Sequence, residues 1–385
     1  MNVRFAAFLA AVAVAAGSAD AAARIHPGVH RALRSDGKVN LVIELAQTTE
    51  STLENIKEST YSSREAKLLA VTEKLQAQNK VASAEVTKVL SQEAEGLHGG
   101  FQNFWISNQI TVEDASFDLV VKLSELASVS EILEQEEWGV KKIGANKVWA
   151  DGNIGQGVVV ASIDTGVRAS HEVLKHNFVG KYGWYDPEKQ SAEPYDVDGH
   201  GSHTMGTIAG AKGVGVAPGA TWMSCKGCRE YMSATGPAVS CPQVDLLACA
   251  QFMLCPTDTN GKNPDCSKAP RVVSNSWGGS GGRPYFQAAA SAWVKAGIIP
   301  VFSAGNSGRD GCTTSGSPGD YPNVIGPDYS IDEVKVALYT TTDQKGLAPS
   351  NYTCGSTSDQ AWPNNQWGHG RLNVFNAYEG FRPAP

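Results

Sequence analysis

The sequence predicts an α/β fold built on a mostly parallel sheet, with a small α+β module ahead of it. An uninterrupted apolar run at residues 158–163 carries this prediction, together with the stretches at 271–279 and 298–306, which are typical of two more strands that end in glycine-containing turns. Uninterrupted apolar runs of this length are typical of parallel strands buried on both faces. The small residues from Thr204 to Gly210 suit a helix packed tightly against such a sheet.

The first 22 residues have the composition of a signal peptide. Arg4 precedes an apolar stretch from Phe5 to Ala16, and small residues with Ala-x-Ala-like cleavage options follow. A membrane span needs about 20 apolar residues, so this stretch is too short to be an anchor. We therefore expect a secreted, extracellular protein that is not held in a membrane.

Residues 23–137 differ in composition from the rest of the chain. Charged residues, Gln and Ala are frequent there, and cysteine is absent. The patterns predict a small α+β domain. Its expected elements are a strand at 38–45, a long helix at 51–95, a strand at 104–106, a helix at 116–126 and a strand at 129–133.

Three residues point to acid–base chemistry. Asp164 ends the first apolar run, so its carboxylate is expected at the carboxyl end of a strand, where open α/β sheets bind ligands. His200 lies between two glycines, and His203, one helical turn further on, is expected to pack or hydrogen-bond. Asn306 is placed to donate its side-chain amide to a developing oxyanion. Each residue alone also suits a turn or a cap, but an acid followed by a histidine is the chain order of the subtilisins.

The chain from about Trp138 onward resembles the subtilisin-like serine proteases (subtilases) of the bacillopeptidase F type. The resemblance implies a doubly wound, mostly parallel sheet in a peptidase domain at 138–385, and a propeptide at 23–137 that chaperones folding. It also implies a monomer that cuts proteins or peptides, with Ser276, Trp277, Gly278 and Gly279 pairing with the substrate as an added strand. The matching stretches are 143–149, 157–166, 196–210, 215–219, 245–250, 274–279, 301–308 and 367–373.

The nucleophile of this family is missing from the sequence. Subtilases carry it in a Gly-Thr-Ser-Met-Ala segment, and no Gly-Thr-Ser occurs in these 385 residues. Residues 321–326 resemble the strand after the oxyanion loop, and residues 327–338 resemble the helix that follows the nucleophile helix. We therefore expect the domain to be truncated internally by several tens of residues between Gly326 and Pro327.

No other serine is a credible replacement. Ser280 lies in a Gly-x-Ser-x-Gly sequence, but in the fold that uses this elbow the serine precedes the acid and the histidine. Ser330 fits a helix capping box with Glu333. Ser356 and Ser358, near Cys354, suit a disulfide loop. The chain as written should be inactive, because removing the nucleophile from subtilisin costs about 10⁶-fold in turnover.

All eight cysteines lie beyond the first domain, at 225, 228, 241, 249, 255, 266, 312 and 354. An even count behind a signal peptide predicts disulfides, but eight cysteines allow 105 pairings. Cys225 and Cys228 could instead suggest zinc, yet no second pair of the right form follows. We expect no metal or other cofactor, although structural calcium is common in the resembled family. Asn351 lies in a glycosylation sequon.

The formal net charge is −7 and 18% of the residues are charged. Without a basic patch, nucleic acid is not an expected partner. Two functional classes remain. One is a secreted endopeptidase written here without its nucleophile segment, and the other is an inactive pseudoprotease that binds peptides, inhibitors or its own propeptide.

Overall fold

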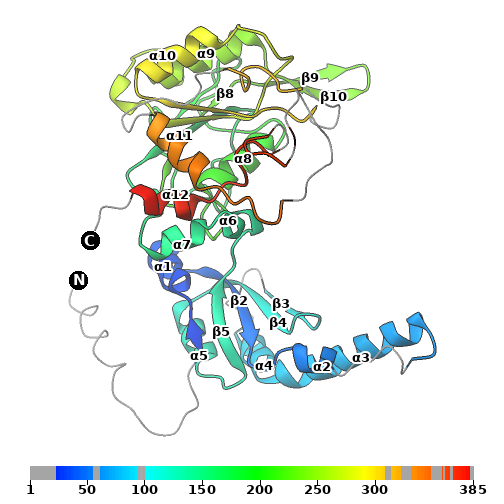
Figure 1. The fold of residues 1–385 in the computed structure, drawn as a ribbon. Coiled ribbons are helices and arrows are strands. Elements are labelled where there is room, and N and C mark those ends of the chain that lie inside the picture. The colour runs from blue at the N-terminus through cyan, green and yellow to red at the C-terminus, as the bar shows by residue number, and fades with distance from the viewer. Residues whose placement is uncertain are drawn as a thin grey trace, which may run out of the picture. The chain divides into compact units, whose positions relative to one another are not determined.

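The computed structural model describes residues 23–54, 61–93, 97, 100–307, 314–321, 331–347, 358, 360–364 and 367–381 (Figure 1). The chain divides into two compact units, at Met1–Gln135 and Glu136–Pro385. The boundary is narrow, because the Gln135 N–H donates to Asn40 O within the first unit and the Glu137 N–H donates to Gly213 O within the second. The predicted signal peptide, the Gly326/Pro327 junction, Ser330, Asn351, Ser356, Cys312 and Cys354 lie outside the described residues.

The first unit is a five-stranded sheet with helices, in the order β1-β5-β2-β4-β3. β1 runs parallel to β5, and the other pairs are antiparallel. Every second residue of β2 is buried and packs with residues of α4 and α5, as expected for a sheet with one covered face. The elements are β1 (Arg24–Ile25), α1 (Pro27–Asp36), β2 (Val39–Leu45), α2 (Glu50–Glu54), α3 (Arg64–Ala82), α4 (Ala84–Gln92), β3 (Phe101–Phe104), β4 (Gln109–Ala115), α5 (Phe117–Ser124) and β5 (Val129–Glu134).

The helix expected over 51–95 is interrupted. The hydroxyl of Ser63 accepts from the Ala66 N–H and so starts α3, and Ser83 ends α3 and precedes α4. Serine favours helix ends because its side chain competes for backbone groups. The sequence analysis also missed β4, which pairs with β2 and β3.

The second unit is built on a parallel sheet in the order β12-β11-β6-β8-β7. Val160 of β6 packs with the helix α8, whereas Ala161 and Ile163 of the same strand pack with α9 and α10. Helices therefore cover both faces, which confirms the doubly wound α/β prediction. The elements are α6 (Trp138–Lys142), α7 (Ala145–Ala150), β6 (Val159–Asp164), β7 (Trp184–Tyr185), α8 (His200–Ala209), β8 (Thr221–Lys226), β9 (Arg229–Ser233), β10 (Gly236–Ser240), α9 (Gln243–Leu254), the 3₁₀ helix η3 (Cys266–Lys268), β11 (Val272–Asn275), α10 (Gln287–Lys295), β12 (Ile299–Phe302), α11 (Ile331–Thr340) and α12 (Val374–Phe381).

Three disulfides brace the second unit, at Cys225–Cys249, Cys228–Cys241 and Cys255–Cys266. The first ties β8 to α9, and the second closes the base of the β9–β10 hairpin. Cys225 and Cys228 each bond to a distant cysteine, so they do not form the zinc pair that the sequence could also suggest. Nowhere in the described ranges do three His, Cys, Asp or Glu side chains gather as they would around a metal ion. Within the same ranges, no helix is both long and apolar enough to cross a membrane.

Phe286 anchors the core on the α9–α10 face of the sheet. Its fully buried ring packs edge-to-face with the rings of Trp277, Trp293 and Phe302. Aromatic pairs in this geometry stabilise a core beyond the area that they bury.

We predict that Phe286→Ala lowers the free energy of unfolding of the second unit by about 3–5 kcal/mol, because it leaves a cavity among three aromatic rings. Urea denaturation followed by tryptophan fluorescence measures this change. Met232→Ala is the matched control, since that side chain is 76% exposed and its loss should change stability by less than about 0.5 kcal/mol. Equal effects of the two substitutions would contradict the assignment of Phe286 to the core.

Candidate active site

Asp164 ends the central strand β6, and its carboxylate is buried. β8 and β7 lie on one side of β6 in the sheet, and β11 and β12 lie on the other. The strand order thus reverses at β6, and ligands of open α/β sheets bind outside the carboxyl ends of the strands at such a point. The sheet topology therefore places Asp164 where a ligand site is expected.

His200 is the first residue of α8, and its imidazole meets the carboxylate of Asp164. The Nδ1 atom of His200 lies 2.7 Å from Oδ1 of Asp164. The same carboxylate accepts from the Thr165 N–H at 2.7 Å and from the Thr204 hydroxyl at 3.2 Å. When Nδ1 carries the proton, Nε2 of the neutral ring keeps its lone pair and can accept a proton from a nucleophile.

Two glycines allow the helix and the strand to come this close. A Cβ on Gly201 would lie 1.9 Å from the carbonyl oxygen of Gly166, and a Cβ on Gly166 would lie 2.0 Å from that of Tyr195. Gly166 also has a φ of +106°, which favours glycine. The Asp164–His200 contact thus depends on the absence of side chains at both positions.

The electrostatic environment of His200 is acidic. The hydrogen bond to Asp164 is the main cause that raises the pKa of His200 above its ordinary value, and the charges of Asp164, Asp198 and Asp196 add to it. Partial burial opposes the shift, but the side chain is still 45% exposed. The imidazole is therefore accessible to a reacting group and is stabilised when it takes a proton.

Asn306 lies on the loop after β12, at the same edge of the sheet, and is exposed. Because β12 is two strands from β6, strand spacing alone separates the two loops by about 10 Å. The structure brings Asp164 and His200 into contact and places Asn306 on a loop at the same sheet edge, two strands away. Of the serines considered as replacement nucleophiles, Ser280 and Ser358 are described, and neither hydrogen-bonds to His200.

The predicted peptide-binding stretch follows β11. The Trp277 ring is buried against Phe286 and Phe302, so it belongs to the core. The Gly279 N–H donates to Ser317 O at 2.9 Å, so one backbone donor of the stretch is already used. Ser276 is half-buried and Gly278 is exposed. Any contact of this stretch with a peptide would therefore come from its backbone or from Ser276, not from the indole.

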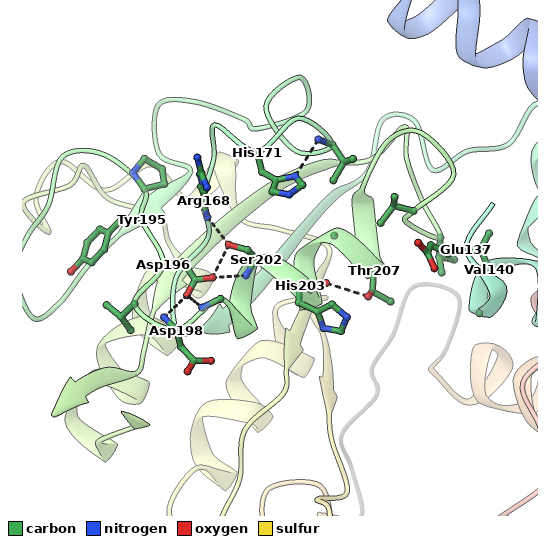
Figure 2. Close-up of a pocket in the computed structure, with 18 of the residues that line it drawn as sticks. Glu137, Val140, Arg168, His171, Tyr195, Asp196, Asp198, Ser202, His203 and Thr207 are labelled. Carbon is green, nitrogen blue, oxygen red and sulfur yellow. Dashed lines mark hydrogen bonds between the residues drawn. The ribbon is translucent and has the colours of Figure 1, made fainter. Parts of the chain in front are cut away.

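A pocket of about 1100 Å³ lies beside α8 (Figure 2). Ser202, His203 and Thr207 of α8 line it, but Asp164 and His200 do not. His203 is exposed in this pocket, whereas the sequence analysis expected it to pack or to hydrogen-bond. The acid–base pair therefore does not line this cavity, although Asp198 and Gly199, the two residues before His200, do.

Sequence reasoning missed the polar residues that surround the pair. Thr165, Asp196, Ser202 and Thr204 all hydrogen-bond where the end of β6, the loop before α8 and the first turn of α8 meet. One sequence signal could have identified Asp196. It is an acidic residue three positions before Gly199, the glycine that caps the predicted helix. Such a residue is suited to accept from the free N–H groups of the first turn.

A histidine hydrogen-bonded to a buried carboxylate, at the carboxyl edge of a doubly wound sheet, has the geometry that a Ser-His-Asp site requires of its acid and base. The subtilase family model matches residues 155–365, and the chain belongs to this family.

The chain is also similar to several curated proteases. It is 32% identical to Bacillopeptidase F of Bacillus subtilis (strain 168) over 285 residues, which are 62% of this chain and 19% of the relative. It is 30% identical to the minor extracellular protease Vpr of the same organism, over 75% of this chain and 36% of the relative. It is 31% identical to Subtilisin-like protease 1 of Trichophyton equinum, over 57% of this chain and 41% of the relative. The chain therefore spans well under two thirds of the length of these relatives.

We predict that Asp164→Asn lowers the pKa of His200, because the substitution removes both the charge-assisted hydrogen bond and the nearest negative charge. A pH titration of the His200 Cε1–H by NMR, assigned with a His200→Gln sample, measures the shift. The matched control is Asp151→Asn, an exposed acid that is not among the groups that shift His200. An unchanged His200 pKa in Asp164→Asn would contradict the described pair.

Proposed function

We propose that this protein is a subtilisin-like serine endopeptidase whose nucleophile segment is not present in the sequence as written. The hydrogen bond between Asp164 and His200 carries the proposal, because it sets the imidazole to accept a proton from a serine hydroxyl. Family membership supports the same chemistry. The missing segment belongs between Gly326 and Pro327, where the sequence passes directly from one family-like stretch to the next.

Each proposed residue has one role. Asp164 holds the tautomer and orientation of His200 and stabilises the imidazolium. His200 takes the proton of the serine and later gives it to the leaving amine. Asn306 donates its amide to the oxyanion, a role that is worth about 10²- to 10³-fold in rate in subtilisin. The backbone at Ser276–Gly279 holds the peptide, and the proposed proton transfers and oxyanion contact use groups of the protein itself, so we propose no cofactor.

The proposal also covers secretion, the propeptide, the oligomeric state and glycosylation. We propose that residues 1–22 direct secretion, which three disulfides and the name of one relative, an extracellular protease, support. Residues 23–137 would be a propeptide, since they precede the residues that the family model matches and all but the last two belong to the first compact unit, which ends at Gln135. The enzyme would act as a monomer on proteins or peptides, and glycosylation at Asn351 belongs to the same proposal.

The second candidate function is a pseudoprotease that binds peptides without cutting them. The absence of Gly-Thr-Ser from the sequence is the observation that favours it. Retention of the complete Asp164–His200 pair favours the protease, because a binding-only protein has no use for a positioned general base.

We predict that the 385-residue chain is not labelled by a fluorophosphonate probe and does not hydrolyse casein, since Gly-Thr-Ser is absent from the sequence and no serine among the described residues hydrogen-bonds to His200. A chain that carries an in-frame Gly-Thr-Ser segment between Gly326 and Pro327 should react with the probe and cleave casein. Gel fluorescence measures labelling, and His200→Ala in both chains is the matched control.

Labelling of the 385-residue chain that depends on His200 would show that another serine acts, and would contradict the assignment of the missing segment. Failure of the extended, folded chain to label would refute the protease proposal.

A further inference from the structure

The carboxylate of Asp196 gathers five hydrogen-bond donors in the loop before α8. Oδ1 accepts from the Thr165 hydroxyl at 2.7 Å, the Gly199 N–H at 2.9 Å and the Asp198 N–H at 3.1 Å. Oδ2 accepts from the N–H of Ser202 at 2.8 Å and from its hydroxyl at 2.6 Å. Figure 2 shows these last two bonds where the loop meets the helix. Because both oxygens of the carboxylate accept hydrogen bonds, Asp196 holds together the segments that supply the donors.

The donors belong to the two segments that carry the acid–base pair. Thr165 directly follows Asp164, and Ser202 lies two residues after His200. The Thr165 hydroxyl, while donating to Asp196, also accepts from the Gly201 N–H at 2.9 Å. The Asp196 carboxylate therefore links Thr165, the residue after β6, to Ser202 in the first turn of α8, and Thr165 also binds that turn directly through the Gly201 N–H.

The start of α8 needs such a partner. Its N-cap is Gly199, which has no side chain to accept from the free N–H groups of the first turn. A negative charge at this end of a helix is also favourable. Burial acts to raise the pKa of Asp196, but the hydrogen bonds from Ser202, Gly199, Asp198 and Thr165 together lower it, so the group is ionised at neutral pH.

We propose that Asp196 is a positioning residue for His200, which holds the first turn of α8 against the end of β6 and so fixes the hydrogen bond to Asp164. Nothing in the proton-transfer step requires Asp196 to touch the substrate. The role of His200 as general base rests on the proposed function, but the geometry that Asp196 maintains exists in the chain as written. It can therefore be measured without any proteolysis.

Asp198 provides the matched control. Asp198 lies two residues after Asp196 and two residues before His200. Its Oδ1 accepts from the His200 N–H at 3.2 Å. Its charge raises the pKa of His200 more than the charge of Asp196 does. Among the described residues, the Asp198 side chain has no hydrogen bond to the end of β6, and Asp198→Asn keeps an oxygen that can accept from the His200 N–H, so this substitution removes the charge without removing a link between β6 and α8.

The experiment compares the wild-type chain with Asp196→Asn and Asp198→Asn by NMR. Two signals of His200 are recorded, namely the pH titration of Cε1–H and the far-downfield resonance of the Nδ1–H that is shared with Asp164. Asp196→Asn should lose or broaden the downfield resonance, because an amide presents N–H groups to donors that need an acceptor. It should also lower the pKa of His200 more than Asp198→Asn does, whereas Asp198→Asn should keep the downfield resonance.

If Asp196→Asn keeps the downfield resonance and shifts the pKa no more than Asp198→Asn, Asp196 acts only as a charge and the proposal is wrong. If Asp196→Asn fails to fold by circular dichroism, Thr165→Val gives the second test, since it removes the linking hydroxyl at nearly constant volume. Both signals unchanged in a folded Thr165→Val would overturn the proposal. Failure of an extended chain to cleave casein would refute the protease function and leave this result standing.

Discussion

The hydrogen bond between Asp164 and His200 is the interaction on which the rest of the site depends. It joins the end of the central strand to the start of a helix, and it forms only because Gly166 and Gly201 let two backbones approach within van der Waals contact. A buried carboxylate is costly unless its oxygens are satisfied, and here the imidazole, a backbone N–H and the Thr204 hydroxyl satisfy them. The same donors that make the carboxylate tolerable also orient it toward the histidine.

The surrounding fold holds these two elements rigidly. β6 is the middle strand of the parallel sheet, with α8 on one face and α9 and α10 on the other. On the neighbouring strand, the register partner of Asp164 is Lys226, a fully buried cation whose Nζ lies 2.7 Å from Glu188 and 3.6 Å from Asp186. The Cys228 N–H donates to the carbonyl of Asp164, and Cys228 is itself in a disulfide. Core packing, a buried ion network and a covalent bridge thus converge on one strand end.

Much of this could be predicted from sequence, because local patterns sufficed for it. The apolar run before Asp164 identified a central strand, and the small residues after His200 identified a closely packed helix. β8 was missed, since Thr221–Lys226 mixes polar and apolar residues and its lysine is buried only through distant carboxylates. The hydrogen bonds to the Asp196 carboxylate were missed for the same reason. The fold brings their donors together, and no regular spacing in the sequence indicates them. The three described disulfides likewise needed coordinates, and Trp277 proved to be a core residue although its motif suggested a cleft.

We propose that the Asp164–His200 pair belongs to a subtilase domain whose nucleophile segment is missing between Gly326 and Pro327. Sequencing the transcript from the source organism across this junction tests the proposal. We expect an in-frame segment that encodes Gly-Thr-Ser between the two codons. A uniform transcript that joins the two codons directly would contradict it, and the protein would then have to be understood as a protein that binds peptides without cutting them.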